Sequence, residues 1–142
     1  METGPSLFDQ YLQRLGEELE MEPLPSFRED GTLLLNLGAA APLILRREES
    51  FCSLGCELAP VPAEYQEALF TLLMKGNFLG LETGESAIGV DLEGKKILLS
   101  RSITYDLRYI EFKEMLEEVV NYAEHWRARI ASFLQGFSDA PV

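Results

Sequence analysis

The sequence predicts an α+β domain in which three helices pack on one mainly antiparallel sheet of five strands, in the order α-β-β-β-α-β-β-α. Apolar residues recur at helical spacing in three segments, and five short segments are typical of strands. The connections between neighbouring strands are too short for a parallel crossover, which needs about a dozen residues or more. We expect one domain over residues 1–142, with a frayed tail at about 137–142.

The first helix is expected to begin at Ser6, because Pro5 stops any earlier turn and Ser6 with Asp9 forms a capping-box-like start. Two prolines in the stretch MEPLPSFREDG end the helix and supply a loop. The apolar residues at helical spacing are Leu7, Phe8, Tyr11, Leu12, Leu15 and Leu19. With polar residues opposite, this stripe predicts an amphipathic helix of about four turns.

Three strand candidates follow in quick succession, at residues 32–37, 41–49 and 51–58. The third has the clearest alternation, and its apolar face would carry Cys52, Leu54, Cys56 and Leu58. Because the connections are short, these strands should pair in antiparallel fashion.

A second helix is expected over residues 61–78, with a proline near its first turn, Glu64 and Glu67 close to its start, and Gly76 at its end. The last two turns are apolar nearly all round. Such a helix is either central in the domain or covered by a second subunit.

Two more strands are expected at residues 86–92 and 95–103, joined by a turn at Glu93-Gly94. A long amphipathic helix should follow, capped by Asp106 and stopped by Gly136.

The composition excludes several classes of function. Twelve basic against 24 acidic residues give a formal net charge of −12, which argues against nucleic-acid binding because phosphate contacts draw on clustered Lys and Arg. The N-terminus lacks the basic start and apolar run of a secretory signal, and no apolar stretch approaches the roughly 20 residues that span a bilayer. We therefore expect a cytoplasmic protein with no membrane insertion.

The stretch GVDLEGKK, from Gly89 to Lys96, resembles the phosphate-binding pattern G-x-x-x-x-G-K-[ST]. That motif needs a helix after its glycine-rich loop, whereas here a strand is expected on both sides. Lys96 also stands where the magnesium-binding Ser or Thr would be. A hairpin turn explains the same residues, because glycine tolerates the positive φ that such turns require.

No catalytic or metal site is predicted. Cys52 and Cys56 would lie on one face of a strand about 13 Å apart, too far for a disulfide, and are expected to be reduced core thiols. His125 is the sole histidine and is expected to be solvated or packed on its helix. The acidic residues lie mostly on solvent faces of helices, so we expect no enzyme and no cofactor.

Three segments resemble the class I type III secretion chaperones, the family that includes the Tir and YopE chaperones. The first is the helix LFDQYLQRLGEEL, and the third is FKEMLEEVVNYAEHWRARI, with Val119, Ala123 and Trp126 at the family's spacing. The second and most specific segment runs from Tyr65 to Ile103. There the positions that match the family pattern are Asn77, Gly84, Gly89, Asp91 and Leu99. The resemblance covers Leu7 to Leu134.

The resemblance implies a small acidic homodimer without ATPase activity in the bacterial cytosol. Such a protein binds the N-terminal, chaperone-binding segment of secreted effectors, keeps them secretion-competent, and releases them at the secretion apparatus. The effector segment would wrap around the dimer in extended form, in apolar grooves or by strand addition at a sheet edge.

The resemblance also assigns site residues. It places the effector-holding patches on the first helix and on the outward residues of the first strands, which gives Phe8, Tyr11, Leu12, Leu15, Leu33, Leu35, Leu43 and Leu45. Each of these residues is equally suited to the core. The subunit contact of the family involves the second helix and its neighbouring strand, which gives Leu69, Leu72, Leu73 and Phe78.

An alternative function on the same fold is an adaptor or regulatory protein that forms heterodimers with another chaperone, a gatekeeper protein or a transcription partner. An enzyme with an unrecognised acidic site is a third possibility. The sequence does not distinguish a homodimer from a heterodimer, and it names no effector.

Overall fold

The computed structural model describes residues 5–37 and 41–138. In chain order its elements are α1 (Pro5–Glu18), β1 (Thr32–Leu35), β2 (Leu43–Arg47), β3 (Phe51–Pro60), α2 (Gln66–Asn77), the short 3₁₀ helix η1 (Phe78–Gly80), β4 (Ala87–Val90), β5 (Lys96–Thr104) and α3 (Tyr109–Ser138). The predicted fold class and the order of helices and strands are confirmed; η1 was not predicted.

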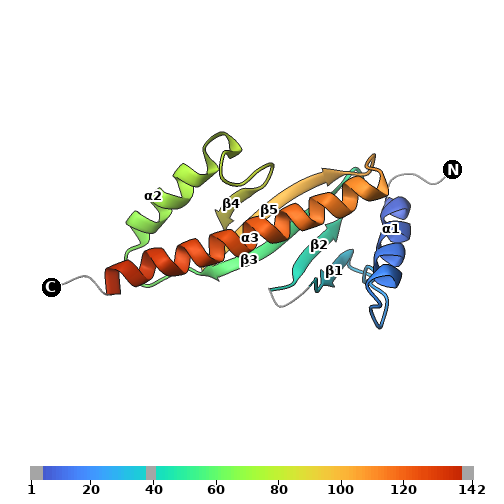
Figure 1. The fold of residues 1–142 in the computed structure, drawn as a ribbon, viewed down its shortest axis with the longest axis horizontal. Coiled ribbons are helices and arrows are strands. Elements are labelled where there is room, and N and C mark those ends of the chain that lie inside the picture. Colours follow the sequence, from blue (N-terminus) through green and yellow to red (C-terminus); the bar gives the residue numbers. More distant parts are fainter. Residues whose placement is uncertain (1–4, 38–40, 139–142) are drawn as a thin grey trace.

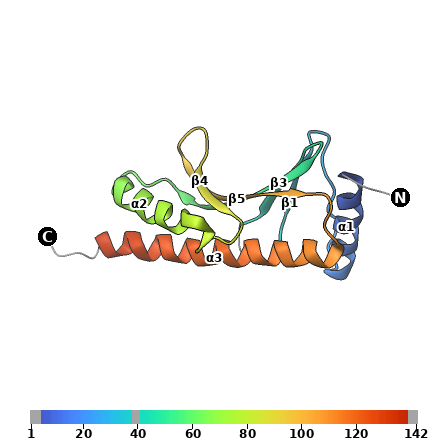
Figure 2. The ribbon, with the colours of Figure 1, turned by 90° about the horizontal axis from the view of Figure 1, so that it is seen from above.

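The five strands form one sheet in the order β1-β2-β3-β5-β4, and all neighbouring strands are antiparallel. Helix α3 runs along the length of the molecule and packs on β3, as Figures 1 and 2 show. Helix α1 lies at the N-terminal end of α3, and α2 lies beside β4 towards the other end. The two edge strands, β1 and β4, therefore belong to opposite ends of the molecule.

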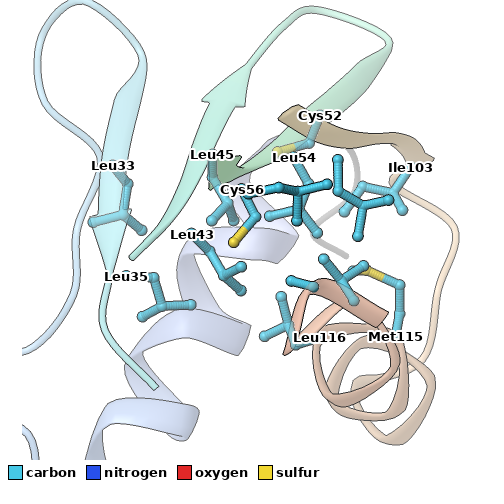
Figure 3. Close-up of a cluster of buried hydrophobic side chains, with 14 of the residues drawn as sticks. Leu33, Leu35, Leu43, Leu45, Cys52, Leu54, Cys56, Ile103, Met115 and Leu116 are labelled. Carbon is cyan, nitrogen blue, oxygen red and sulfur yellow. The ribbon is translucent and has the colours of Figure 1, made fainter. Parts of the chain in front are cut away.

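The core lies between the sheet and α3. Strand β3 alternates as predicted, with the side chains of Cys52, Leu54, Cys56 and Leu58 buried. Figure 3 shows the inward side chains of β1, β2 and β3 converging with Met115 and Leu116 of α3. Burial of these apolar surfaces is the main favourable term in the fold.

The second helix begins at Gln66, five residues later than expected. Strand β3 continues to Pro60, and Tyr65 has a left-handed backbone with φ of 64° just before the first helical turn. At the other end Gly76 lies inside α2 and does not stop it. A Cβ atom at Gly76 would lie 2.4 Å from ring carbons of Trp126, so this glycine allows close packing of α2 on α3.

The last helix also differs from the expectation at both ends. It begins at Tyr109, and it continues through Gly136 to Ser138. The ring of Phe137 stacks on that of Tyr65 with centroids 4.4 Å apart, and this contact favours helix beyond the glycine. Residues 137 and 138 are thus helical, whereas the rest of the expected tail lies outside the described residues.

The hairpin between β4 and β5 is confirmed. Gly94 has φ of 72°, and its N–H donates to the carbonyl of Asp91 at 3.0 Å. The carboxylate of Asp91 accepts the N–H groups of Lys95 and Lys96 at 2.7 and 3.1 Å. The segment that resembles a phosphate-binding loop is therefore a hairpin turn. The carboxylate of Asp91 accepts the backbone N–H groups that a phosphate would otherwise need.

Candidate partner-binding surfaces

Most residues assigned to partner binding are buried in the core. The exposed fraction is between 0% and 6% for Phe8, Leu12, Leu15, Leu33, Leu35, Leu43 and Leu45. The expectation that the strand residues of this set point outward is wrong, because Leu33 pairs with Leu45, and Leu35 with Leu43, on the face that α1 and α3 cover. Tyr11 is half-buried, and its hydroxyl donates to the carbonyl of Leu107 at 2.6 Å.

The outward face of the same strands carries a different apolar pair. Leu34 and Ile44 lie opposite each other in the register, and they are 45% and 43% exposed. The next positions across the sheet, Gly55, Ser100 and Ala87, carry small side chains. The accessible apolar atoms of β1 and β2 are therefore those of Leu34 and Ile44.

Strand β1 also presents a backbone edge that is unpaired at Leu34 within the described residues, whereas both backbone groups of Thr32 are bonded on that side. The N–H of Arg47 donates to the carbonyl of Gly31 at 2.7 Å, whereas the carbonyl of Thr32 accepts from Arg28 at 2.8 Å on the other side. Bonded positions alternate along an antiparallel pair, so the N–H and C=O of Leu34 point away from β2. Such an edge can accept an added strand.

An apolar groove of about 340 Å³ separates the end of α1 from α3. We call it the α1–α3 groove; its lining residues are Leu15, Leu19, Leu37, Lys113, Leu116, Glu117, Val120 and Asn121. Leu19 is 52% exposed, and Leu37 follows β1 closely in the chain. The groove therefore lies next to the free edge of β1, on the helix side of the sheet.

A group of polar contacts holds α1 against α3 beside this groove. The Nζ of Lys113 lies 2.9 Å from the carboxylate of Glu18, and this hydrogen bond lowers the pKa of Glu18. The guanidinium of Arg14 lies 4.1 Å from the centroid of the Tyr109 ring. Desolvation, assisted by Glu18, raises the pKa of Tyr109 to about 12, so its hydroxyl stays protonated at neutral pH.

A second accessible apolar surface lies at the other end of the molecule. We call it the α2–β4 surface, and define it by Met74, Phe78, Leu79 and Val90, which are 72%, 63%, 80% and 42% exposed. A groove of about 240 Å³ beneath it runs between α2 and β4. Exposed apolar residues gathered in this way mark an interaction surface.

The residues assigned to the dimer interface are divided by the structure. Leu69 and Leu73 are buried at 0% and 4% exposure and pack into the core, Leu72 is half-buried, and Phe78 belongs to the α2–β4 surface. Met74 and Leu79 belong to the same exposed surface and were not in the predicted set. The sequence feature that could have drawn attention to Leu79 is the run FLG directly after α2. In the structure the backbone of this run is left-handed, with φ of 54° at Leu79 and 69° at Gly80. A left-handed leucine that is 80% exposed is unusual and favours a role outside the core.

The groups that could carry chemistry are placed as expected. Cys52 and Cys56 are free and buried, and desolvation raises the pKa of both thiols, that of Cys52 to about 11. The predicted core thiols are confirmed. His125 is exposed, and the centroids of its ring and the Trp126 ring are 5.7 Å apart, with the two rings nearly perpendicular. Neither cysteine is a thiolate nucleophile at neutral pH.

Accessible apolar surfaces at two ends of a small α+β domain define a class of protein that acts by binding other polypeptides. The sequence matches the Tir chaperone protein (CesT) family over residues 10–127, and the chain belongs to this family. The resemblance to class I type III secretion chaperones is thereby confirmed.

The chain is also similar to known proteins in sequence and in fold. The chain is 35% identical over 74 residues to the Chlamydia pneumoniae protein CPj0713/CpB0740; the match covers 51% of this chain and 56% of that protein. Its fold is similar to a chain of the ExsC–ExsE complex, with a TM-score of 0.72 and 20% identity over 87% of this chain and 92% of the other. A chain of the HopA1–SchA chaperone–effector complex gives a TM-score of 0.69 and 19% identity over 86% and 94% of the two chains.

Over residues 5–37 and 41–138, no helix combines the length and the apolar character needed to cross a membrane.

Proposed function

We propose that the protein is a cytosolic chaperone of bacterial type III secretion, which binds the N-terminal segment of secreted effector proteins and keeps them soluble and secretion-competent. Membership of the CesT family supports this function. The structural observation that carries it is the separation of two accessible apolar surfaces, one around the β1 edge and one at α2 and β4. One surface can hold a client while the other holds a second subunit.

The surface around β1 suits an extended client segment. The α1–α3 groove lies on the helix side of the sheet, Leu34 and Ile44 lie on the opposite side, and the free backbone edge of β1 lies between them. A polypeptide that passes around this edge would contact all three features. Side chains in the groove and the outward pair would supply apolar contact, and the edge would supply backbone hydrogen bonds.

The α2–β4 surface suits a second copy of the chain. Its four residues are all apolar, so an apolar surface of a second subunit would cover them well. Lys75, the nearest basic residue of α2, is exposed at the same end of the helix. A two-fold contact would cover Phe78 and Leu79 with the same residues of the other subunit. We propose a homodimer through this surface, which leaves both β1 edges accessible at the two outer ends.

Co-expression tests the function. The protein is expressed with the N-terminal segments of secreted proteins encoded beside its gene, and the complexes are purified and their masses measured by light scattering. We expect soluble complexes that contain two copies of the chaperone. Leu19→Asp should abolish client retention without loss of the dimer, because it places a charge in the α1–α3 groove. A stable monomer that retains no client would refute the proposal, and heterodimers with another chaperone would favour the adaptor function.

A further inference from the structure

A third groove, which the proposed function does not use, lies along the other flank of α3. Its volume is about 630 Å³, and its lining residues are Leu81, Glu82, Glu114, Glu117, Glu118, Asn121, Tyr122, His125 and Arg129. Four of these are glutamates and one is an arginine. We call it the acidic groove.

The acids of this groove are only partly neutralised. Glu82 pairs with Arg129 at 3.0 Å. Glu118 lies 3.6 Å from Arg101, which also binds Glu85 at 2.8 Å. Within residues 5–37 and 41–138, Glu114 and Glu117 form no ion pair. Like charges at this helical spacing repel each other, so the groove holds negative charge that a cation from outside would stabilise.

The groove is also partly apolar. Leu81 is 73% exposed at its margin, and the ring of Tyr122 forms part of its wall. A free metal ion or a simple salt cation gains nothing from such contacts. A lysine or arginine side chain combines an apolar stem with a charged end and matches both properties.

The acidic groove and the α1–α3 groove meet. Glu117 and Asn121 line both, so the two grooves adjoin at these side chains on α3. A polypeptide that fills the apolar groove with one part of its length can continue across α3 into the acidic groove. Continuity favours one occupant over two.

We propose that the acidic groove binds a Lys- or Arg-bearing stretch of the same client polypeptide whose apolar stretch occupies the α1–α3 groove. This inference rests on the proposed function and adds a requirement to it: clients carry basic residues next to the apolar stretch. The acidic groove then acts as a selectivity element, because a client with acidic residues at that place would meet Glu114 and Glu117.

The test uses three fluorescent peptides and the intact protein. One peptide of about 12 residues carries leucines at alternating positions, as an extended segment would present them, a second carries lysines among glycine and serine, and a third joins the two. Binding is measured by fluorescence anisotropy at about 50 and 300 mM salt. The double variant Glu114→Gln and Glu117→Gln removes the unpaired charges. The matched control, Glu49→Gln with Glu64→Gln, changes net charge equally at exposed sites away from the groove.

We expect the joined peptide to bind more tightly than either half. Its affinity should fall about fivefold in the groove variant at low salt, and less at high salt, because two exposed ion pairs are lost. The control should bind like the parent protein. Equal losses in groove variant and control, no loss in either, or a joined peptide that binds no tighter than its halves would each overturn the inference.

Failure of the proposed function gives a different pattern. Leu19→Asp tests the apolar groove alone, so the leucine peptide should lose binding in that variant and keep it in the single variant Glu114→Gln, because Glu114 lines the acidic groove only, whereas Glu117 lines both. A leucine peptide that never binds, or that ignores Leu19→Asp, contradicts the proposed client site whatever the lysine peptide does. A leucine peptide that behaves as expected, beside a lysine peptide insensitive to Glu114 and Glu117, contradicts only the inference.

Discussion

The side chain of Asn77 forms hydrogen bonds with both backbone groups of Ile88: its Oδ1 accepts the N–H at 2.7 Å, and its Nδ2 donates to the carbonyl at 2.8 Å. The carboxamide therefore takes the place of a neighbouring strand at the outer edge of β4. It ties the last residue of α2 to the sheet immediately before Phe78 and Leu79. The same contact closes this edge at Ile88, so β1 offers the more open edge for strand addition.

Asn77→Ala should lower the free energy of unfolding by about 1–3 kcal/mol, because a backbone N–H and a carbonyl at a 7% exposed residue lose their partners. Chemical denaturation monitored by circular dichroism measures this change. Asn121→Ala is the control: Asn121 is exposed on α3, its side chain forms no hydrogen bond with the described residues, and its replacement should change stability by less than about 0.5 kcal/mol. Equal denaturation midpoints for Asn77→Ala and the parent protein would contradict this role.

Two helical glycines should respond to alanine in opposite directions. Gly76→Ala places a Cβ 2.4 Å from the buried ring of Trp126, and we expect a loss of about 1–3 kcal/mol from overpacking. Gly136→Ala meets nothing within 4 Å in α3, and alanine should stabilise that helix by about 0.5–1 kcal/mol. Thermal unfolding of the two variants gives the comparison. If Gly76→Ala were also stabilising, the close contact between α2 and Trp126 would be refuted.

These glycines also mark the limit of what could be predicted from the sequence. Both were expected to end a helix, because glycine after an apolar stripe is a common stop signal. Whether a ring from another element presses on the backbone is a tertiary property, and no local pattern near Gly76 reports the position of Trp126. The hairpin at Glu93-Gly94 was predictable because turn chemistry is local.

The fold class was predictable because the periodicity of helices and strands is also a local property of the sequence. The orientation of the first two strands was not predictable. In β3 apolar and small or polar residues alternate, and the buried face follows from the pattern. In β1 three successive leucines place apolar side chains on both faces of the strand. The alternation of a strand therefore does not tell which leucines face the core. The candidate site was therefore assigned to Leu33 and Leu35, although the exposed residue is Leu34.

Asp91→Asn should remove one pH-dependent contribution to stability. Hydrogen bonds from the N–H groups of Lys95 and Lys96 hold the pKa of Asp91 below its ordinary value of 3.8. A carboxyl with a lowered folded pKa stabilises the fold above its unfolded pKa, and the contribution is lost as pH falls through the folded pKa. The parent protein should melt at a higher temperature than the variant near neutral pH, and the difference should shrink below about pH 4. A difference that stays constant down to about pH 2 would refute this assignment.

Leu33 and Leu34 are neighbours on opposite faces of the sheet, and alanine at each position tests stability and client binding separately. Leu33 is 6% exposed, so Leu33→Ala should cost about 2–5 kcal/mol of unfolding free energy through the cavity it leaves. Leu34 is 45% exposed beside Ile44, so Leu34→Ala should change stability by less than about 0.5 kcal/mol. If the client passes around the β1 edge, Leu34→Ala should still weaken client retention in the co-expression assay, because it removes apolar contact from the outward face. Unchanged retention by a normally folded Leu34→Ala would exclude this face from the client site and leave the α1–α3 groove as its apolar part.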